Sequence, residues 1–147
     1  MKRFRRATDD DSDAILDMMR RYYEEEGYPF VKDVARSALK TLNSDERLGK
    51  LWVADVDGNV AGYLAVTLGF SLEFGGMDAF LDEIYIDQPF RGQGLGKAAA
   101  ELAIGYCRGI GVKALHLEVE PHRTAARELY ERMGFENHDR ELMTRKI

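Results

Sequence analysis

The segment Arg91-Gly92-Gln93-Gly94-Leu95-Gly96 decides how the rest of the sequence is interpreted. It follows an apolar stretch from Phe80 to Ile86, and it opens a stretch whose apolar residues recur at helical spacing. A glycine-rich turn between a strand and a helix lets the backbone approach a ligand, and the free N–H groups at the helix start point at negative charge. The turn therefore predicts a phosphate-binding site, with Arg91 and Lys97 adding positive charge at its mouth.

Two common nucleotide-binding motifs do not fit this turn. The dinucleotide fingerprint requires a third glycine three residues after Gly94, where the sequence has Lys97. A Walker P-loop requires glycine at the position of Arg91 and Ser or Thr at the position of Ala98. On the hexapeptide alone, an ordinary strand-to-helix turn without a ligand remains the alternative.

The pattern of apolar residues along the chain predicts an α/β fold in a single domain, residues 1–147. Asp57-Gly58-Asn59 predicts a hairpin between two of the strands. The expected strands are Phe4–Ala7, Leu51–Val56, Val60–Phe70, Phe80–Ile86 and Ala114–Val119, with Leu142–Lys146 as one that closes the sheet. The expected helices start at Thr8, Val31, Leu95 and Thr124, and they end near Gly27, Leu42, Gly109 and Gly134.

Composition limits the class of protein. The 147 residues are 45% hydrophobic, enough for one core, and no apolar run approaches the length of a membrane span. Cys107 is the only cysteine, which excludes an internal disulfide and favours a reducing, cytoplasmic location. The three histidines lack zinc-binding spacing, so we expect no metal. A net charge of −5 without a basic run after residue 6 argues against nucleic acid as a partner.

The sequence from Leu81 to Phe135 resembles the GCN5-related N-acetyltransferase (GNAT) superfamily. Its turn motif, Gln/Arg-x-x-Gly-x-Gly/Ala, is matched by Arg91, Gly94 and Gly96. A later Leu-Tyr-x-x-x-Gly-Phe motif is matched by Leu129, Tyr130, Gly134 and Phe135. The resemblance implies the acyl-CoA N-acyltransferase fold, a mixed, mostly antiparallel sheet of six to seven strands flanked by about four helices. It also implies acetyl-CoA as co-substrate, and a homodimer is plausible.

The same resemblance implies which residues contact acetyl-CoA. Backbone N–H groups around Ile84, Tyr85 and Ile86 are expected to face the pantetheine and the thioester carbonyl. The pyrophosphate is expected on Arg91, Gly92, Gln93, Gly94, Leu95, Gly96 and Lys97. Ala126 belongs to the last motif, and three residues before it, where the family usually has Asn, this sequence has Arg123. Arg123 either reaches a phosphate or carbonyl of CoA or is a solvated side chain.

Acetyl transfer to an amine needs a base for the amine, a group that holds the oxyanion and an acid for the leaving thiolate. Asp82 and Glu83 are neighbours on a predicted strand, so they are expected to point to opposite faces. We expect Glu83 to be the base, because it shares a face with Leu81 and Tyr85, and Asp82 is the second choice.

The expected acid is Tyr130, since the matching tyrosine of the family lies beside the cofactor sulfur. Without the resemblance, Tyr130 reads as a core residue on the last helix. Cys107 lies inside a predicted helix without a nearby histidine in sequence, so we expect a buried side chain and direct transfer without an acyl-enzyme.

The acceptor site of the family is built largely by the first two helices and their connection. Acidic and aromatic residues there would attract and stack an ammonium group, as expected of a small amine, polyamine or amino-sugar. The candidates are Tyr22, Tyr23, Glu24, Glu25, Glu26, Tyr28 and Phe30, with Phe70, Glu73 and Phe74 as the opposite wall. A solvated helix end with core aromatics explains the same residues equally well. A protein N-acetyltransferase and a non-catalytic CoA-binding sensor remain open, although the bulky Tyr28-Pro29-Phe30 connection favours small acceptors.

Overall fold

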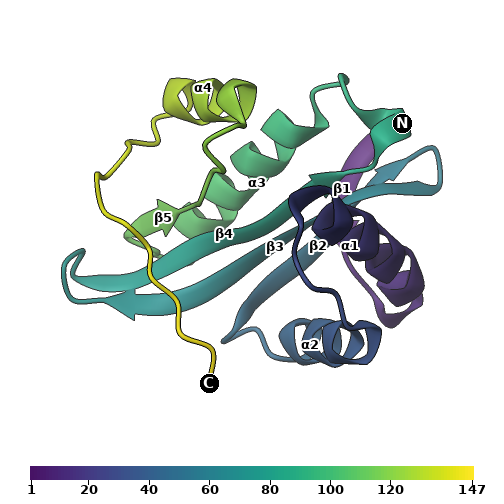
Figure 1. Cartoon of the computed structure of the whole chain (residues 1–147), viewed down its shortest axis with the longest axis horizontal. Helices are drawn as coiled ribbons and strands as arrows, with labels where there is room; N and C mark the ends of the chain where they lie inside the picture. Colours follow the sequence, from purple (N-terminus) through teal and green to yellow (C-terminus); the bar gives the residue numbers. More distant parts are fainter. The chain divides into compact units, whose positions relative to one another are not determined.

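The computed structural model describes residues 1–147 as two compact units, Met1–Leu117 and Glu118–Ile147. The first unit holds a five-stranded sheet in the order β1-β2-β3-β4-β5, and the second holds one helix (Figure 1). No helix has the length and the apolar character that crossing a membrane requires.

Four antiparallel strands and one parallel strand form the sheet. Their bounds are β1 Lys2–Arg6, β2 Gly49–Val56, β3 Asn59–Ser71, β4 Gly76–Ile86 and β5 Ala114–His116. The predicted hairpin is confirmed between β2 and β3, where Asp57 and Gly58 have φ of 52° and 84°. A tight two-residue hairpin loop needs this left-handed backbone, and Asp and Gly tolerate it best.

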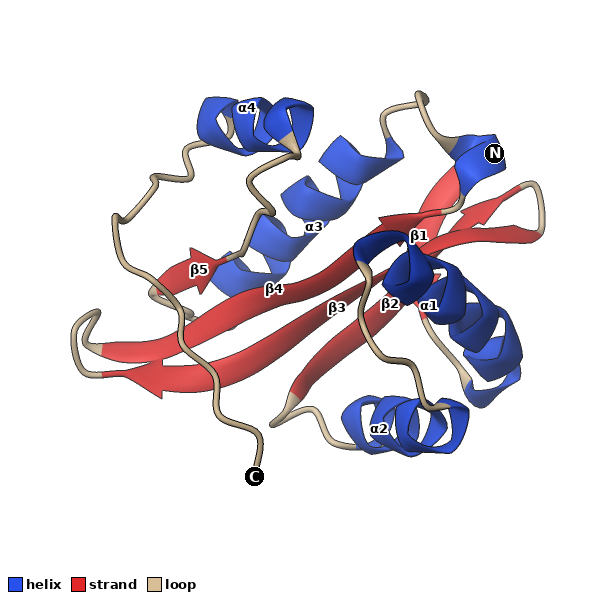
Figure 2. Ribbon diagram, in the orientation of Figure 1, coloured by secondary structure: helices blue, strands red, loops and turns tan.

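Three helices cover the two faces of the sheet: α1 Ser12–Glu26, α2 Lys32–Ser44 and α3 Leu95–Gly109. Successive side chains of β2 alternate between the faces. Leu51 and Val53 pack into the core cluster with α1 and α2, whereas the Trp52 ring stands 5.0 Å from that of Tyr106 on α3. Figure 2 shows the same arrangement, with α1 and α2 on one side of the strands and α3 on the other.

A buried carboxylate fixes the start of α1. Asp11 is 5% exposed and accepts two hydrogen bonds from the Arg5 guanidinium, at 2.8 and 2.9 Å. It also accepts one from the Thr8 backbone N–H at 2.8 Å, as part of a capping box at the 3-10 turn Asp9–Asp11 that precedes α1. The bonds from Arg5, assisted by the bond from Thr8, lower the pKa of Asp11.

The second unit corrects one prediction. Its helix, α4, spans Thr124–Arg132 as expected, but Leu142–Lys146 forms no strand. Leu142 and Met143 are adjacent and remain 69% and 91% exposed, so this segment has no alternating apolar face to bury in a sheet. The sheet therefore has five strands instead of the expected six to seven, and β5 ends at His116 instead of Val119.

Candidate functional site

A β-bulge in β4 determines where the two candidate carboxylates point. Ala65 of β3 lies opposite Glu83, whereas Val66 lies opposite Leu81, which leaves Asp82 as an extra residue in β4. Asp82 lines a pocket with α2, and Glu83 contacts α1, so both side chains lie on the α1/α2 side. The prediction of opposite faces is wrong, because strict alternation holds only for a regular strand.

Two tyrosines hold Glu83. The hydroxyl of Tyr63 donates to Oε1 at 2.7 Å, and the hydroxyl of Tyr23 donates to Oε2. Burial raises the pKa of Glu83, the two phenol hydrogen bonds oppose that shift, and the charge of Asp82 adds to it. The net effect is a raised pKa, which suits a carboxylate that takes a proton from an ammonium group.

Asp82 makes no hydrogen bond or ion pair within the chain. Asp82 is exposed to solvent, but it stands in a pocket where neighbouring atoms limit its hydration. This desolvation raises the pKa of Asp82. Two carboxyl groups with raised pKa values on one side of the sheet are typical of a proton-transfer site.

The edge of β4 that faces β5 is only partly paired. β5 pairs with Asp78–Phe80, but β4 runs on to Ile86, so Leu81–Ile86 has no strand partner on this edge. The backbone that sequence analysis assigned to acetyl-CoA, at Ile84, Tyr85 and Ile86, belongs to this stretch. Unpaired backbone donors beside Asp82 and Glu83 offer a place for an acyl group.

The glycine turn has the geometry predicted for it. Gly92 and Gly94 have φ of 78° and 80°, a conformation that favours glycine, and Gly94 is the N-cap of α3. A side chain at either position would meet no atom within 4 Å. The N–H of Ala98 donates to the carbonyl of Gly94 at 3.1 Å, so the three N–H groups before it have no intrahelical acceptor and are available to an anion.

Arg91 holds the turn against two other elements. Its Nε donates to the Ile86 carbonyl at 2.8 Å, and its guanidinium lies 3.3 Å from the Glu25 carboxylate and 5.2 Å from the centre of the Tyr85 ring. Glu25 therefore offsets part of the positive charge of Arg91, which the sequence predicted at the mouth of the phosphate-binding turn. This contact joins residues 66 positions apart, and no local pattern signals it.

The predicted acceptor residues of the first helix form one aromatic cluster. The rings of Tyr22, Tyr23, Tyr28 and Phe30 contact one another at centroid distances of 5.7 to 6.2 Å. Tyr22, Tyr23 and Phe30 pack against the core, whereas Tyr28 is 41% exposed and Glu26 is half-buried.

The residues predicted as the opposite wall of the acceptor site lie on the hairpin between β3 and β4, away from the aromatic cluster. The ring of Phe74 lies 5.3 Å from that of His116, which contacts the Asp78 carboxylate at 3.1 Å. Phe70, on the same hairpin, is 71% exposed. None of these contacts joins Phe74 to the aromatic cluster of α1.

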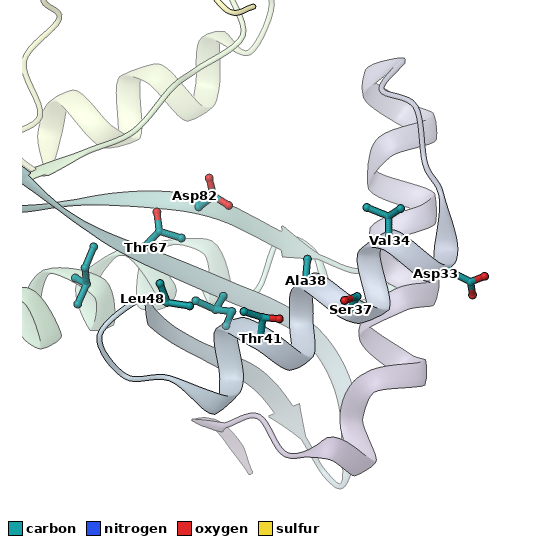
Figure 3. A pocket seen from close by; sticks show the side chains of 10 residues that line it. Asp33, Val34, Ser37, Ala38, Thr41, Leu48, Thr67 and Asp82 are labelled. Carbon is teal, nitrogen blue, oxygen red and sulfur yellow. The ribbon is translucent and has the colours of Figure 1, made fainter. Parts of the chain in front are cut away.

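A pocket of about 820 Å³ lies between α2 and the strands β3 and β4 (Figure 3). One wall is formed by α2, with Val34, Ser37, Ala38, Thr41 and Leu42. The other wall is formed by Leu48, Thr67, Leu68 and Asp82. This pocket could not be predicted from the sequence, because the spacing of Val34 and Ala38 indicates a helix face but not which strands lie opposite it.

In the second unit, Tyr130 lies on α4 with its ring 5.8 Å from that of Phe135. Burial raises the pKa of Tyr130, although the charge of Arg123 opposes this shift. Arg123 is the N-cap of α4, and Ala126 lies in its first turn.

Cys107 is buried in α3, as predicted, and desolvation raises its pKa, which leaves its thiol a poor nucleophile.

The sheet, the half-open edge of β4 and the glycine turn at α3 define the acyl-CoA N-acyltransferase fold. The profile of the acetyltransferase (GNAT) family matches residues 13–135, and the chain belongs to this family, whose members use acetyl-CoA.

Three relatives illustrate the similarity. An uncharacterized N-acetyltransferase of Methanocaldococcus jannaschii is 31% identical over 135 residues, which are 90% of this chain and 59% of that protein. A mycothiol acetyltransferase of Geodermatophilus obscurus is 41% identical over 59 residues, 38% of this chain and 19% of that protein. An integron cassette protein from the mobile metagenome of Cole Harbour Salt Marsh superposes with a TM-score of 0.86 at 33% identity, covering 98% of this chain and 90% of that one. The chain thus spans little more than half of the first relative.

Proposed function

We propose that this protein transfers the acetyl group of acetyl-CoA directly to a primary amine of a small molecule. The observation that carries the proposal is the bulge at Asp82, because it turns two carboxylates with raised pKa to one side, next to the unpaired edge of β4. Neither the glycine turn nor the open edge alone would imply chemistry, since a protein that only binds CoA needs both of them as well.

The reaction proceeds by attack of the neutral amine on the thioester carbonyl carbon. Glu83, or Asp82 beside it, takes the proton that the ammonium must lose before its nitrogen attacks. Among Ile84, Tyr85 and Ile86, the backbone N–H groups that point away from β3 hold the oxygen that becomes negative as the C–N bond forms. The carbon–sulfur bond then breaks and the CoA thiolate leaves, while the nitrogen, which became positively charged on attack, releases its second proton to solvent and forms the neutral amide.

Tyr130 supplies the proton that the thiolate takes up. Its phenol carries a proton at neutral pH, as any tyrosine does, and burial raises its pKa further. Arg123 and Ala126 at the start of α4 contact CoA, with Arg123 directed at a phosphate or carbonyl. Since the Cys107 thiol is buried, no cysteine competes as an acyl carrier, which supports direct transfer.

The small-molecule acceptor is supported by two observations. One relative is a mycothiol acetyltransferase by name, and the Tyr28-Pro29-Phe30 connection places bulky side chains beside the aromatic cluster. A peptide acceptor would need an open groove at this connection. The alternatives are a protein N-acetyltransferase and a sensor that binds CoA without turnover.

An acceptor screen tests the proposal. CoA thiol release is measured with acetyl-CoA over polyamines, other alkylamines, amino-sugars, amino acids and peptides. Release with at least one small amine, lost in the Glu83→Gln, Asp82→Asn double variant, supports the proposal. Release with peptides alone favours the protein acceptor. If acetyl-CoA raises Tm but no amine gives release, the protein is a sensor.

A further inference from the structure

The pocket beside α2 has an apolar lining that the core uses only in part, through Leu42. α2 buries Ala35 and Leu39 in the core cluster that also contains Leu51 and Val53. Val34 and Ala38 lie at the edge of the same apolar stripe and line the pocket, and Val34 is 66% exposed. A soluble helix usually turns its apolar stripe inward, so the part of this stripe that stays exposed on α2 indicates a surface that something else covers.

The opposite wall adds apolar side chains and two hydroxyl groups. Leu48, which is 43% exposed, and Leu68 extend the apolar surface, while Thr67 of β3 and Thr41 of α2 bring hydroxyls. Figure 3 shows Thr67 next to Asp82 at one end, with Leu48, Thr41 and Ala38 continuing away from them. The pocket is thus polar at the Asp82 end and mainly apolar beyond it.

The charges in the pocket favour a cation at one end only. No Lys or Arg lines it, and the carboxylate of Asp82 makes no hydrogen bond or ion pair within the chain. The second acid, Asp33, lies at the far end on α2, and its side chain points away from Asp82 (Figure 3). A second ammonium group along Val34 and Ala38 would lose water without gaining a partner.

We propose that this pocket binds the acceptor, and that the acceptor is a primary monoamine with an apolar body instead of a polyamine or an amino-sugar. Its ammonium group lies at Asp82, and its apolar body lies along Val34, Ala38 and Leu48. The inference rests on the proposed function, because it takes the bound amine to be the group that is acetylated. It narrows the acceptor to one class.

A series of unbranched alkylamines from propylamine to hexylamine measures the apolar part. Each buried methylene strengthens binding, so kcat/KM for CoA release should rise by about threefold per added methylene. The matched competitor is 1,6-diaminohexane, which has the length of hexylamine and a second ammonium group. Hexylamine should be the better substrate by at least about tenfold. Equal rates along the series, or a preference for the diamine, would overturn the proposal.

Val34→Asp tests the position of the apolar body. It places a carboxylate on the exposed apolar wall, so the preference should shift from hexylamine toward 1,6-diaminohexane by about tenfold or more. Val31→Asp is the matched control, because Val31 is 61% exposed, close in sequence and outside the pocket lining. The control should leave the preference unchanged. If both variants shift the preference between the two amines equally, the shift comes from the added negative charge alone, and the pocket is not the acceptor site.

Calorimetry separates this inference from the proposed function. Hexylamine is titrated into the CoA-saturated protein and into its Val34→Asp and Asp82→Asn variants. Binding that both substitutions weaken, without CoA release from any amine, would uphold the pocket and overturn acetyl transfer. CoA release from other amines without any binding of hexylamine would uphold acetyl transfer and overturn the pocket.

Discussion

At the scale of single residues, Glu83 combines two opposing influences. Tyr23 and Tyr63 donate to its two oxygens, which favours the ionised form, while burial and the charge of Asp82 favour the neutral form. The second effect is larger, so the pKa is raised. The ionised form of Glu83 therefore lowers the free energy of unfolding at neutral pH. The raised pKa also makes the carboxylate a stronger base.

Glu83→Gln should therefore lower activity and raise stability. We expect kcat/KM to fall by about 100-fold, the usual scale of a lost general base. The folded-state pKa of Glu83 lies above its unfolded value, so ionised Glu83 costs stability above both values, and that cost disappears as pH falls through the raised pKa. The Tm of Glu83→Gln should exceed that of the wild type at pH 7 and approach it in acid.

Asp17→Asn is the control for this pair of measurements, because Asp17 is exposed on α1 and outside the site. It should change neither rate nor Tm. A Glu83→Gln variant with wild-type turnover would remove Glu83 as the base and leave Asp82 in that role.

Tyr130→Phe should lower turnover without affecting the binding of acetyl-CoA. The substitution keeps the ring that packs against Phe135 and removes only the hydroxyl. We expect kcat to fall by about 100-fold, as for the loss of a general acid, while the rise of Tm with acetyl-CoA stays the same. Stopped-flow measurement of thiol release gives the rate. An unchanged kcat with a good acceptor would show that another group protonates the thiolate.

At the scale of elements, the two ends of α3 offer a matched pair of glycines. Gly94 before the helix and Gly111 after it have φ of 80° and 81°, and a side chain at either would meet nothing within 4 Å. Leucine at either position should cost about 1–2 kcal/mol of folding free energy through left-handed strain. Only Gly94→Leu should also weaken acetyl-CoA binding, by at least about tenfold, because it fills the space before the free N–H groups. Equal affinities in the two variants, measured by calorimetry, would remove the turn as the pyrophosphate site.

The junction of β1 with α1 depends on Asp11. Asp11→Asn should destabilise the first unit by about 1–3 kcal/mol at pH 7, because it leaves Arg5 and Thr8 with a poorer acceptor. The folded pKa of Asp11 is lowered, so the stabilisation is present above the unfolded pKa and is lost as pH falls through the folded one. The difference from the wild type should therefore shrink in acid.

Urea unfolding followed by Trp52 fluorescence, at pH 7 and in acid, measures this difference. Asp13→Asn is the control, since its ion pair with Arg36 is largely exposed and should contribute little. A cost for Asp11→Asn that persists in acid would show that shape, not charge, sets the role of Asp11.

At the scale of the whole molecule, local patterns predicted most elements but few contacts. The helices, the β2–β3 hairpin and the turn before α3 follow from periods of 3.6 and 2 and from glycine placement, all of which lie within short stretches. The bulge at Asp82 depends on how Ala65 and Val66 pair with β4, and register between strands leaves no mark in either strand alone. For the same reason, Tyr63 and Glu25 could not be placed beside Glu83 and Arg91 from sequence. The predicted strand at Leu142–Lys146 rested on one apolar pair, too little to define a buried face.

The bulge also makes the length of β4 a functional property. A deletion of Asp82 would restore a regular ladder between β3 and β4, improving the backbone pairing while removing one acid of the pair. The protein would keep its glycine turn, and with it the ability to hold a nucleotide-linked thioester. A single lost codon in this strand would therefore leave Glu83 as the one candidate base beside the open edge of β4.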